Sequence, residues 1–347
     1  MTTRTNRQWL LAKRPVGMVG EADFELREGP APVPGAGDIL VRNLYLSFDP
    51  AMRGWMEDRP SYLPPVGLGD VMRCGAVGQV VESDDPAFPV GGFVQGLFGW
   101  QEYAVSGSGR ATLIPDGTPL TWPLGVLGIT GLTAYFGMLD LGRPMPGETV
   151  VVSGAAGATG SVAAQIARVR GSRVIGIAGG AEKCAWLLDA ARLDAAIDYK
   201  SEDVAARLSA LCPAGIDVFF DNVGGEILDA VLARIALRAR IVLCGGISGY
   251  NEKEPPPGPR NLMNLVRQRG RIEGLIVLDY AKRFGEGTAQ LAEWVGEGQI
   301  AHREDIQHGI ENAPRTFLRL FSGENLGKQL LRVGEPSGAR SSQEGTR

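Results

Sequence analysis

The sequence predicts an α/β protein in which a small barrel-like β domain precedes a parallel sheet with helices on both faces. Up to about residue 125, short apolar runs such as DILVRNLYLSFD and CGAVGQVVES are broken by glycine and proline, a pattern typical of short barrel strands. From Thr149 onwards, apolar runs such as TVVVS and SRVIGIA alternate with helix-length segments, which indicates βα units. The length of 347 residues exceeds what a single hydrophobic core usually supports, so two domains are expected.

The same patterns place the domain boundaries. We assign residues 1–128 to the barrel-like domain and residues 129–300 to the parallel-sheet domain. Residues 301–333 return to mixed character, and we expect a helix and a short strand there to rejoin the first domain. The tail, residues 334–347, is small and polar and is predicted to be disordered.

Composition and charge argue against several classes of function. The net charge of -4 gives no reason to expect a nucleic acid or an anionic membrane as partner. The uncharged stretch between Asp116 and Asp140 is long enough to span a bilayer, but glycine and proline interrupt it throughout, which favours a buried segment. Four scattered cysteines without a CxxC, and no evident signal peptide, predict a reduced, cytoplasmic protein.

A glycine-rich turn follows the first predicted strand of the second domain. Gly154, Gly157 and Gly160 separate TVVVS from the helical pattern SVAAQIARV. Free N–H groups and the helix dipole at such a turn attract a pyrophosphate, and small residues let it approach the backbone. The spacing differs from the usual G-x-G-x-x-G, so a turn needed only for packing is the alternative. The second strand at residues 172–178 favours a dinucleotide site.

The end of that second strand indicates which dinucleotide binds. NAD sites usually have Asp or Glu at this place, accepting from the ribose 2′-hydroxyl. Here Gly179 and Gly180 occupy it, with Lys183 three residues later. The missing acid leaves room for a 2′-phosphate, and the lysine supplies a positive charge, with a solvated surface lysine as the alternative. Glu182 is the alternative ribose ligand, although it fits better in the first turn of the next helix. NADPH or NADP⁺ is therefore the predicted cofactor.

No metal site is expected. Zinc needs cysteine, histidine or carboxylate ligands that converge on one point. The chain has two histidines, His302 and His308, and the first domain has Cys74 as its lone cysteine. Without a metal or an evident histidine base, the chain suits hydride transfer to an already polarised carbon, a reaction in which the cofactor supplies the chemistry.

Six motifs then occur in order across nearly the whole chain: SFDPAMRGWM, GLTAYFGML, AAGATGSVAAQIA, FFDNVGGEILD, LCGGISGYN and ENLGKQLLRV. Together they resemble the zinc-independent medium-chain dehydrogenase/reductase family, in the leukotriene B4 12-hydroxydehydrogenase and prostaglandin reductase group. The bacterial curcumin-reductase-like branch is the most similar. The resemblance implies a GroES-like β-barrel and a Rossmann domain with a doubly wound parallel sheet. It also implies NADPH-dependent reduction of the C=C bond of α,β-unsaturated aldehydes and ketones, by homodimers paired through their Rossmann domains.

The resemblance also implies a set of cofactor-binding residues. Gly157, Ala158, Thr159 and Gly160 would form the pyrophosphate loop. The 2′-phosphate would lie among Gly179, Lys183 and Tyr199, although a strand-end aromatic that caps the core is the alternative for Tyr199. The other members are Asn222, Cys244, Gly245, Gly246, Ile247, Ser248, Tyr250, Leu275, Ile276, Val277 and Asn325.

Enone chemistry requires one more group. When hydride reaches the β-carbon, negative charge gathers on the carbonyl oxygen, and a donor placed there stabilises it. Tyr250 is the predicted catalytic donor, with packing of its loop as the alternative role. Arg53, Arg59 and Tyr62 are predicted from motif position to shape the substrate pocket, with a surface location as the alternative for the arginines. The proline-rich run NEKEPPPGPRN suits a lid.

Two other functions also fit the sequence. An NADPH:quinone oxidoreductase shares the barrel and Rossmann plan and also lacks zinc. A catalytically silent NADP-binding protein would keep the fold and the cofactor without turnover. Saturation of an enone would indicate the enone reductase, whereas hydroquinone formation would indicate the quinone oxidoreductase. Tight NADPH binding without turnover would indicate the second.

Overall fold

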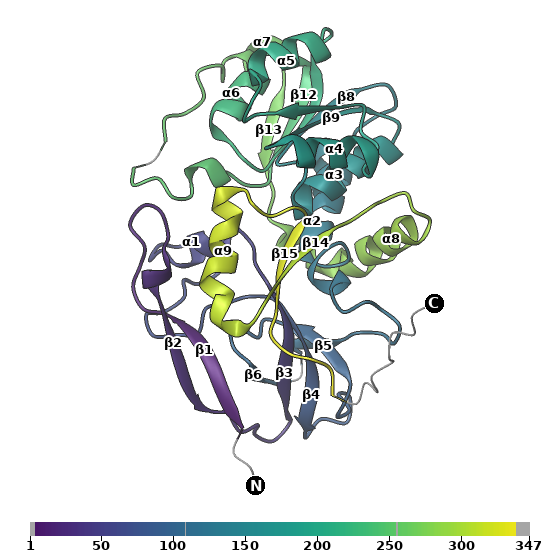
Figure 1. Cartoon of the computed structure of the whole chain (residues 1–347). Helices are drawn as coiled ribbons and strands as arrows, with labels where there is room; N and C mark the ends of the chain where they lie inside the picture. Colours follow the sequence, from purple (N-terminus) through teal and green to yellow (C-terminus); the bar gives the residue numbers. More distant parts are fainter. Residues whose placement is uncertain (1–3, 108, 255, 338–347) are drawn as a thin grey trace, which may run out of the picture.

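The computed structural model describes residues 4–107, 109–254 and 256–337. Two parts lie one above the other, a strand-rich N-terminal domain and an α/β domain, and the last part of the chain runs back along the first (Figure 1). The predicted fold class, a β-barrel-like domain joined to a Rossmann-type parallel sheet, is confirmed. Of the predicted tail, residues 338–347 lie outside the described residues.

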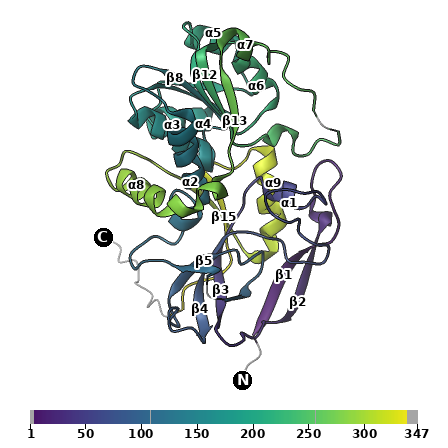
Figure 2. The same ribbon diagram turned by 180° about the vertical axis from the view of Figure 1, so that it is seen from behind.

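The N-terminal domain is built around a seven-stranded sheet with the order β14-β15-β3-β4-β5-β7, in which β6 pairs with β3. Trp100 is its central side chain, with ring centroids 4.9 Å from Phe48, 5.1 Å from Phe24 and 5.6 Å from Phe317. The hairpin of β1 and β2 packs beside it (Figure 2). The elements are β1 Thr5–Leu11, β2 Phe24–Pro30, β3 Asp38–Ser47, α1 Met52–Trp55, β4 Ala76–Ser83, β5 Phe93–Gly96, β6 Tyr103–Gly107 and β7 Ala111–Leu113.

The C-terminal segment contributes two strands to this first sheet. Strand β14 (Glu304–His308) pairs in parallel with β15 (Lys328–Arg332), and β15 pairs antiparallel with β3. Helix α9 (Ala313–Ser322), which connects them, buries Phe317 against Trp100. These pairings support the expected return of the chain to the first domain, while the exact domain bounds stay predictions.

The second sheet has six parallel strands in the order β10-β9-β8-β11-β12-β13. Both faces are covered, so its strands are continuous apolar runs rather than alternating ones. Val150, Val151 and Val152 of β8 are all fully buried, with Val151 facing one core and its neighbours the other. The strands are β8 Thr149–Ser153, β9 Arg173–Ala178, β10 Ala195–Asp198, β11 Ile216–Asp221, β12 Ile235–Leu243 and β13 Arg271–Gly274.

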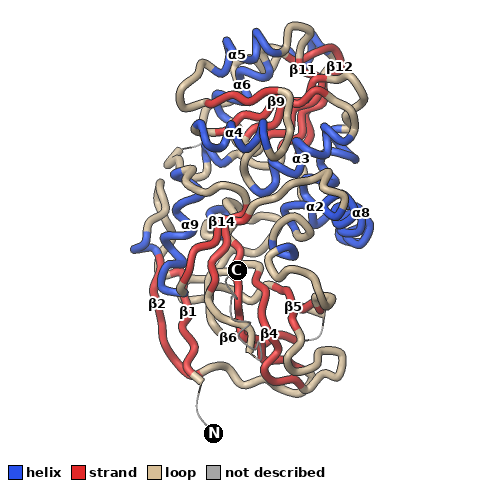
Figure 3. Tube along the Cα trace, turned by 45° about the vertical axis from the view of Figure 1, so that its right-hand side comes forward, coloured by secondary structure: helices blue, strands red, loops and turns tan. Residues whose placement is uncertain are grey.

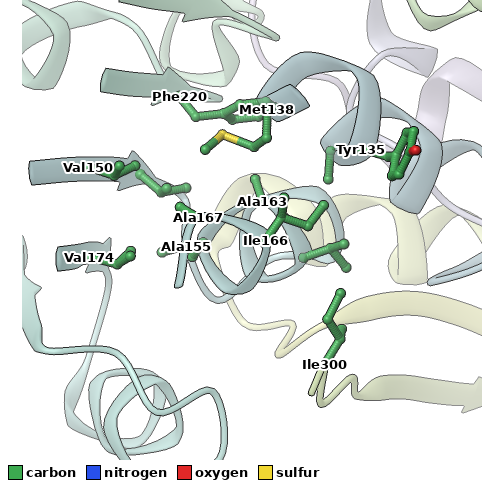
Figure 4. Packing of buried hydrophobic residues seen from close by; sticks show 14 of the residues in the cluster. Tyr135, Met138, Val150, Ala155, Ala163, Ile166, Ala167, Val174, Phe220 and Ile300 are labelled. Atoms are coloured by element: carbon green, nitrogen blue, oxygen red, sulfur yellow. The ribbon is translucent and has the colours of Figure 1, made fainter. Parts of the chain in front are cut away.

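Helices cover the two faces of this sheet, as the alternation of red strands and blue helices in Figure 3 shows. On one face, the small side chains Ala163 and Ala167 of α3 let the helix approach Val150 and Val174 of the sheet (Figure 4). Helices α5 and α6 bury Leu208 and Val231 on the opposite face. The helices are α2 Ile129–Phe136, α3 Ala158–Val169, α4 Ala181–Asp189, α5 Val204–Leu211, α6 Gly225–Leu232, α7 Asn264–Gln268 and α8 Phe284–Gly296.

The uncharged segment between Asp116 and Asp140 is a buried segment, as predicted. Its second half is mostly buried and contains α2, whose Leu132 and Phe136 join the core of the parallel-sheet domain. Within the described ranges, no helix is both long enough and apolar enough to cross a membrane.

Candidate active site

The loops that follow β8, β11 and β12 meet at the end of the parallel sheet where the carboxyl ends of its strands lie. These three strands are neighbours, and the strand order reverses at β8, because β9 lies on its other side. In open α/β sheets, ligands bind outside the carboxyl ends of the strands at such a reversal. The candidate site is therefore this carboxyl end of the sheet, where the returning C-terminal segment of the first domain also lies (Figure 1).

The turn between β8 and α3 forms a cradle of small residues. Gly154 has a φ of +58°, and its carbonyl would lie 2.3 Å from a Cβ added at Gly160. Gly157 is the residue before α3, and no side chain among the described residues caps the N–H groups of the first helical turn. The N–H of Gly157 itself donates to the carbonyl of Gly154 at 3.0 Å. In the predicted loop of Gly157, Ala158, Thr159 and Gly160, the last three residues therefore present the backbone donors, in a space that side chains would fill, which fits a pyrophosphate.

The first domain closes one side of this cradle. Gly327 donates its N–H to the carbonyl of Ala156 at 2.9 Å and forms a parallel bridge with Gly157. Gly327 has a φ of +77°, and an added Cβ would lie 2.0 Å from the carbonyl of Arg303. Asn325, predicted to approach the cofactor from the barrel side, lies in this segment and donates to the carbonyl of Gly327 at 3.1 Å.

The structure brings the three residues predicted for the 2′-phosphate together. The ring of Tyr199 lies against Gly179, where an added Cβ would be 2.8 Å from it. The ammonium of Lys183 donates to the carbonyl of Gly323 at 2.6 Å. Burial lowers the pKa of Lys183, and the positive charge of Lys200 adds to this effect. Lys200 was not predicted, although it directly follows Tyr199 in the sequence.

The alternative ribose ligand, Glu182, points elsewhere. It lies in the first turn of α4, as expected, with a side chain that is 78% exposed and 3.6 Å from Arg303. Asp198, at the end of β10, instead accepts from the backbone N–H of Gly180 at 2.7 Å. Hydrogen bonds from the backbone of Gly180 and Lys200 lower the pKa of Asp198, so this carboxylate holds the turn.

Asp221 and Ser153 organise the loops after β8 and β11, and neither residue was predicted from the sequence. The buried carboxylate of Asp221 accepts from the Ser153 hydroxyl at 2.6 Å and from the Gly224 N–H at 3.0 Å. Burial raises the pKa of Asp221, although these hydrogen bonds oppose the rise. Asn222 donates from its side chain to the Ser153 carbonyl at 2.7 Å. An acidic residue at the end of the buried run VFFD was the available signal.

The other predicted cofactor residues follow β12 and β13. Cys244 and Gly245 both donate their N–H groups to the carbonyl of Asp221, at 2.9 and 3.1 Å. Ser248 donates from its hydroxyl to the Val223 carbonyl at 2.6 Å, which ties the loop after β12 to the loop after β11. Ile247, in the same turn, donates to the carbonyl of Asn222 at 3.3 Å. Past β13, Leu275 and Val277 are buried and Ile276 is 36% exposed.

Tyr250 has one hydrogen bond at its hydroxyl and a proton that is free to donate. The N–H of Gly246 donates to the phenol oxygen at 3.1 Å, and no acceptor for the phenol proton is found among the described residues. Burial raises the pKa of Tyr250. Cys244, and Tyr62 of the first domain, add to this rise of the pKa.

The three residues predicted for the substrate pocket differ in their surroundings. The hydroxyl of Tyr62 accepts from the Trp55 indole at 3.1 Å, and its side chain is 45% exposed. Arg59 is exposed and paired with Glu57. Arg53 is 2% exposed and hydrogen-bonded to protein groups, so contact with a substrate would require these bonds to break. The predicted lid includes residue 255, which lies outside the described residues.

Cys244 has a thiol that we expect to resist the electrophiles of this site. Burial raises its pKa to about 12, so that only about one molecule in 10⁵ carries the reactive thiolate at pH 7. Incubation with an alkyl vinyl ketone in the absence of NADPH should leave Cys244 unmodified by mass spectrometry while free glutathione reacts. Rapid adduct formation at Cys244 would contradict this assignment.

Over the described residues, no three His, Cys, Asp or Glu side chains lie close enough to hold a metal. Cys74 is fully buried, and burial raises the pKa of its thiol. His302 pairs with Glu304 at 2.9 Å and stacks edge-on against Trp122.

A β domain joined to a Rossmann sheet, with a glycine cradle after β8 and a lysine in the helix after β9, defines the class of medium-chain NADP-dependent oxidoreductases. Residues 7–114 match the family described as N-terminal domain of oxidoreductase, and residues 158–294 match the one described as zinc-binding dehydrogenase. The chain belongs to the medium-chain dehydrogenase/reductase family, in its curcumin-reductase-like branch.

Similar proteins support this assignment. The NADPH-dependent curcumin reductase of Escherichia coli is 44% identical over 94% of this chain and 97% of its own length. The putative NADP-dependent oxidoreductase YfmJ of Bacillus subtilis is 47% identical over 96% and 100%. The 2-alkenal reductase (NADP(+)-dependent) of Nicotiana tabacum is 39% identical over 95% and 98%. CurA from Vibrio vulnificus, solved in complex with NADPH, superposes with a TM-score of 0.91 at 43% identity over 95% of this chain and all of CurA. The protein is an NADP-dependent oxidoreductase with NADPH as cofactor.

Proposed function

We propose that this protein reduces the C=C bond of α,β-unsaturated aldehydes and ketones. The observation that carries the proposal is the free phenol proton of Tyr250, in a hydroxyl held by Gly246 at the nicotinamide end of the site. Two of the similar proteins are named for curcumin and for 2-alkenals, both of which contain a C=C bond conjugated to a carbonyl. This likeness of substrate class supports the same chemistry here.

When bound, NADPH supplies the hydride that the β-carbon of such a substrate accepts. The residues of this chain act on the other end of the conjugated system. Tyr250 donates its O–H to the carbonyl oxygen, where negative charge develops. The N–H of Gly246 polarises this phenol by donating to its oxygen, which makes the O–H a stronger donor. The α-carbon then takes its proton from solvent or from Tyr250.

We propose the following placement of the cofactor. Residues 157–160 bind the pyrophosphate at the start of α3, and Asn222, the run 244–248 and the run 275–277 line the nicotinamide end. Lys183, with Gly179 and Tyr199 beside it, takes the 2′-phosphate, and Lys200 adds a second positive charge. Asn325 approaches from the barrel side, and Tyr62 faces the substrate next to Tyr250.

NADPH consumption with a panel of alkenals, enones and quinones, with NADH in parallel, tests the proposed function. We expect loss of NADPH with a saturated carbonyl product and little loss of NADH. Turnover of quinones to hydroquinones without reduction of any enone would assign a quinone reductase. Binding of NADPH without turnover on the whole panel would assign a silent cofactor-binding protein. Both outcomes would overturn the proposal.

We propose that the protein is a homodimer paired through β13, an edge strand of the parallel sheet. This strand reads Arg271-Ile272-Glu273-Gly274 and is largely exposed. Two copies paired antiparallel about Ile272 would place Arg271 of one copy opposite Glu273 of the other, twice. Exposed apolar side chains precede and follow this strand in the sequence: Leu262, Met263, Val266, Ile276 and Leu278.

The four cysteines are free thiols, which supports a reducing compartment, and we propose the cytoplasm.

Charge reversal at this edge is expected to separate the dimer. In Arg271→Glu and in Glu273→Arg, like charges would face each other across the two-fold axis, and sedimentation velocity should show monomer. The double variant, with both charges exchanged, restores the opposite pairs and should restore the dimer. A wild type that sediments as a monomer would contradict the pairing, and so would a dimer unaffected by both single changes.

A further inference from the structure

Asn251, the residue directly after Tyr250, ties the two domains together. Its side-chain oxygen accepts from the backbone N–H of Val19 at 3.2 Å and from Nε of Arg53 at 3.1 Å. Val19 and Arg53 belong to separate segments of the N-terminal domain, whereas Asn251 follows β12 of the parallel sheet. One amide oxygen therefore joins the loop that carries Tyr250 to two segments of the N-terminal domain.

Hydrogen bonds within the first domain fix the guanidinium of Arg53 for this contact. Its guanidinium is 2% exposed and donates to Glu57 at 3.0 Å and to the carbonyl of Gly17 at 3.1 Å. A buried guanidinium is tolerated when its donors are satisfied and a carboxylate balances its charge. Because Glu57 and Gly17 occupy its terminal nitrogens, Nε is left facing Asn251.

Packing between the same segments reinforces the contact. Gly17 has a φ of +78°, and a Cβ there would lie 3.2 Å from Cε of Lys253. The stem of Lys253 thus crosses directly over the backbone of Gly17, two residues beyond Asn251. We name these contacts of Asn251 with Val19 and Arg53 the interdomain clasp.

The other hydrogen bonds around Tyr250 lie within the parallel-sheet domain. Residues 247–249 form a single 3-10 turn, and the N–H of Tyr250 donates to the carbonyl of Ile247 at 3.3 Å. The phenol oxygen accepts from Gly246 within the same loop, and Ser248 binds the carbonyl of Val223 in the loop after β11. Because these bonds join parts of one domain, they shape the loop without fixing its distance from the first domain, where Tyr62 lies.

We propose that Asn251 is a positioning residue: the interdomain clasp sets the place of the Tyr250 hydroxyl relative to the substrate bound between the domains. This inference rests on the proposed function of Tyr250 as donor to the carbonyl oxygen. Arg53 then acts on the reaction through Asn251 and not through contact with the substrate.

A double-mutant cycle tests this role. Asn251→Ala is expected to lower kcat for an enone about tenfold while the KM for NADPH stays unchanged. In the Tyr250→Phe background the same change should have almost no further effect, because the hydroxyl that it positions is gone. Asn251→Asp keeps an acceptor for both donors and should restore most of kcat. If the two changes lowered kcat by independent factors that multiply in the double variant, the positioning role would be overturned. A fully active Asn251→Ala would overturn it as well.

Two further measurements separate this inference from the proposed function. Hydrogen exchange at the Val19 amide should accelerate in Asn251→Ala and stay slow in Asn251→Asp, whatever the substrate. Unchanged exchange would overturn the clasp. Asn261→Ala is the matched control, since Asn261 donates from its side chain to the Asp229 carbonyl at 3.2 Å, inside the parallel-sheet domain. A wild type inactive on every enone would overturn the proposed function and the positioning role, while exchange at Val19 would still report on the contact itself.

Discussion

Replacing Lys183 by alanine is expected to weaken NADPH binding about 10- to 100-fold and to leave NADH binding nearly unchanged. A hydrogen bond to a charged group contributes about 1.5–3 kcal/mol, and each 1.4 kcal/mol is about tenfold in affinity. The 2′-phosphate is the part of NADPH that NADH lacks, and Lys183 lies with Tyr199 and Gly179 where the ribose acid of an NAD site would be. The KM values for both cofactors, measured with one enone, give the comparison.

The pH dependence of the preference for NADPH over NADH is a second test of Lys183. Burial and Lys200 lower the pKa of Lys183, and the ammonium carries its charge below that pKa. The preference for NADPH over NADH should therefore decline at a lower pH than an ordinary lysine would allow. Lys282→Ala, at an exposed lysine, is the control. Equal loss of affinity for both cofactors in Lys183→Ala would contradict the phosphate assignment.

Replacing Tyr250 by phenylalanine is expected to lower kcat for enones about 100-fold with little change in NADPH affinity. Loss of one donor to a developing oxyanion typically costs about 10²- to 10³-fold in kcat. The ring, and with it the packing of the loop, is retained in this variant, so the effect isolates the hydroxyl. Steady-state kinetics with a simple alkenone, together with NADPH titration, separate the two quantities.

The raised pKa of Tyr250 determines how enone turnover should depend on pH. A phenol donates only while protonated, and burial holds its pKa above the usual value. Enone turnover should therefore not fall through loss of this proton at neutral or mildly alkaline pH. Tyr45→Phe, in the first sheet, is the matched control. A Tyr250→Phe enzyme with normal kcat would assign Tyr250 to loop packing alone.

Much of the fold could be predicted because its elements are local in sequence. The buried strands of the parallel sheet are continuous apolar runs, as in Val150 to Val152, and regularly spaced helices separate them. The glycine turn could be found for the same reason, since Gly154 and Gly160 must stay small where strand and helix meet within a few residues. Local patterns therefore identified the cradle.

The candidate site was harder to predict wherever it depends on distant segments. Gly323, which accepts from Lys183, is 140 residues away along the chain, and no periodicity connects the two. The pairing of Asp221 with Ser153 spans 68 residues and links two strand ends whose adjacency follows only from the sheet order. Motif position placed Arg53 near the cleft, but only its contacts reveal the buried bond to Asn251.

The position of deuterium in the product shows which carbon receives the hydride. An enone would be reduced with NADPH that carries deuterium at the transferable position of nicotinamide C4, and the product examined by NMR. We expect a saturated ketone with one deuterium on the β-carbon, because the proposed role of Tyr250 is to stabilise charge on the carbonyl oxygen while the β-carbon receives hydride. Deuterium on the carbonyl carbon of an allylic alcohol would contradict it.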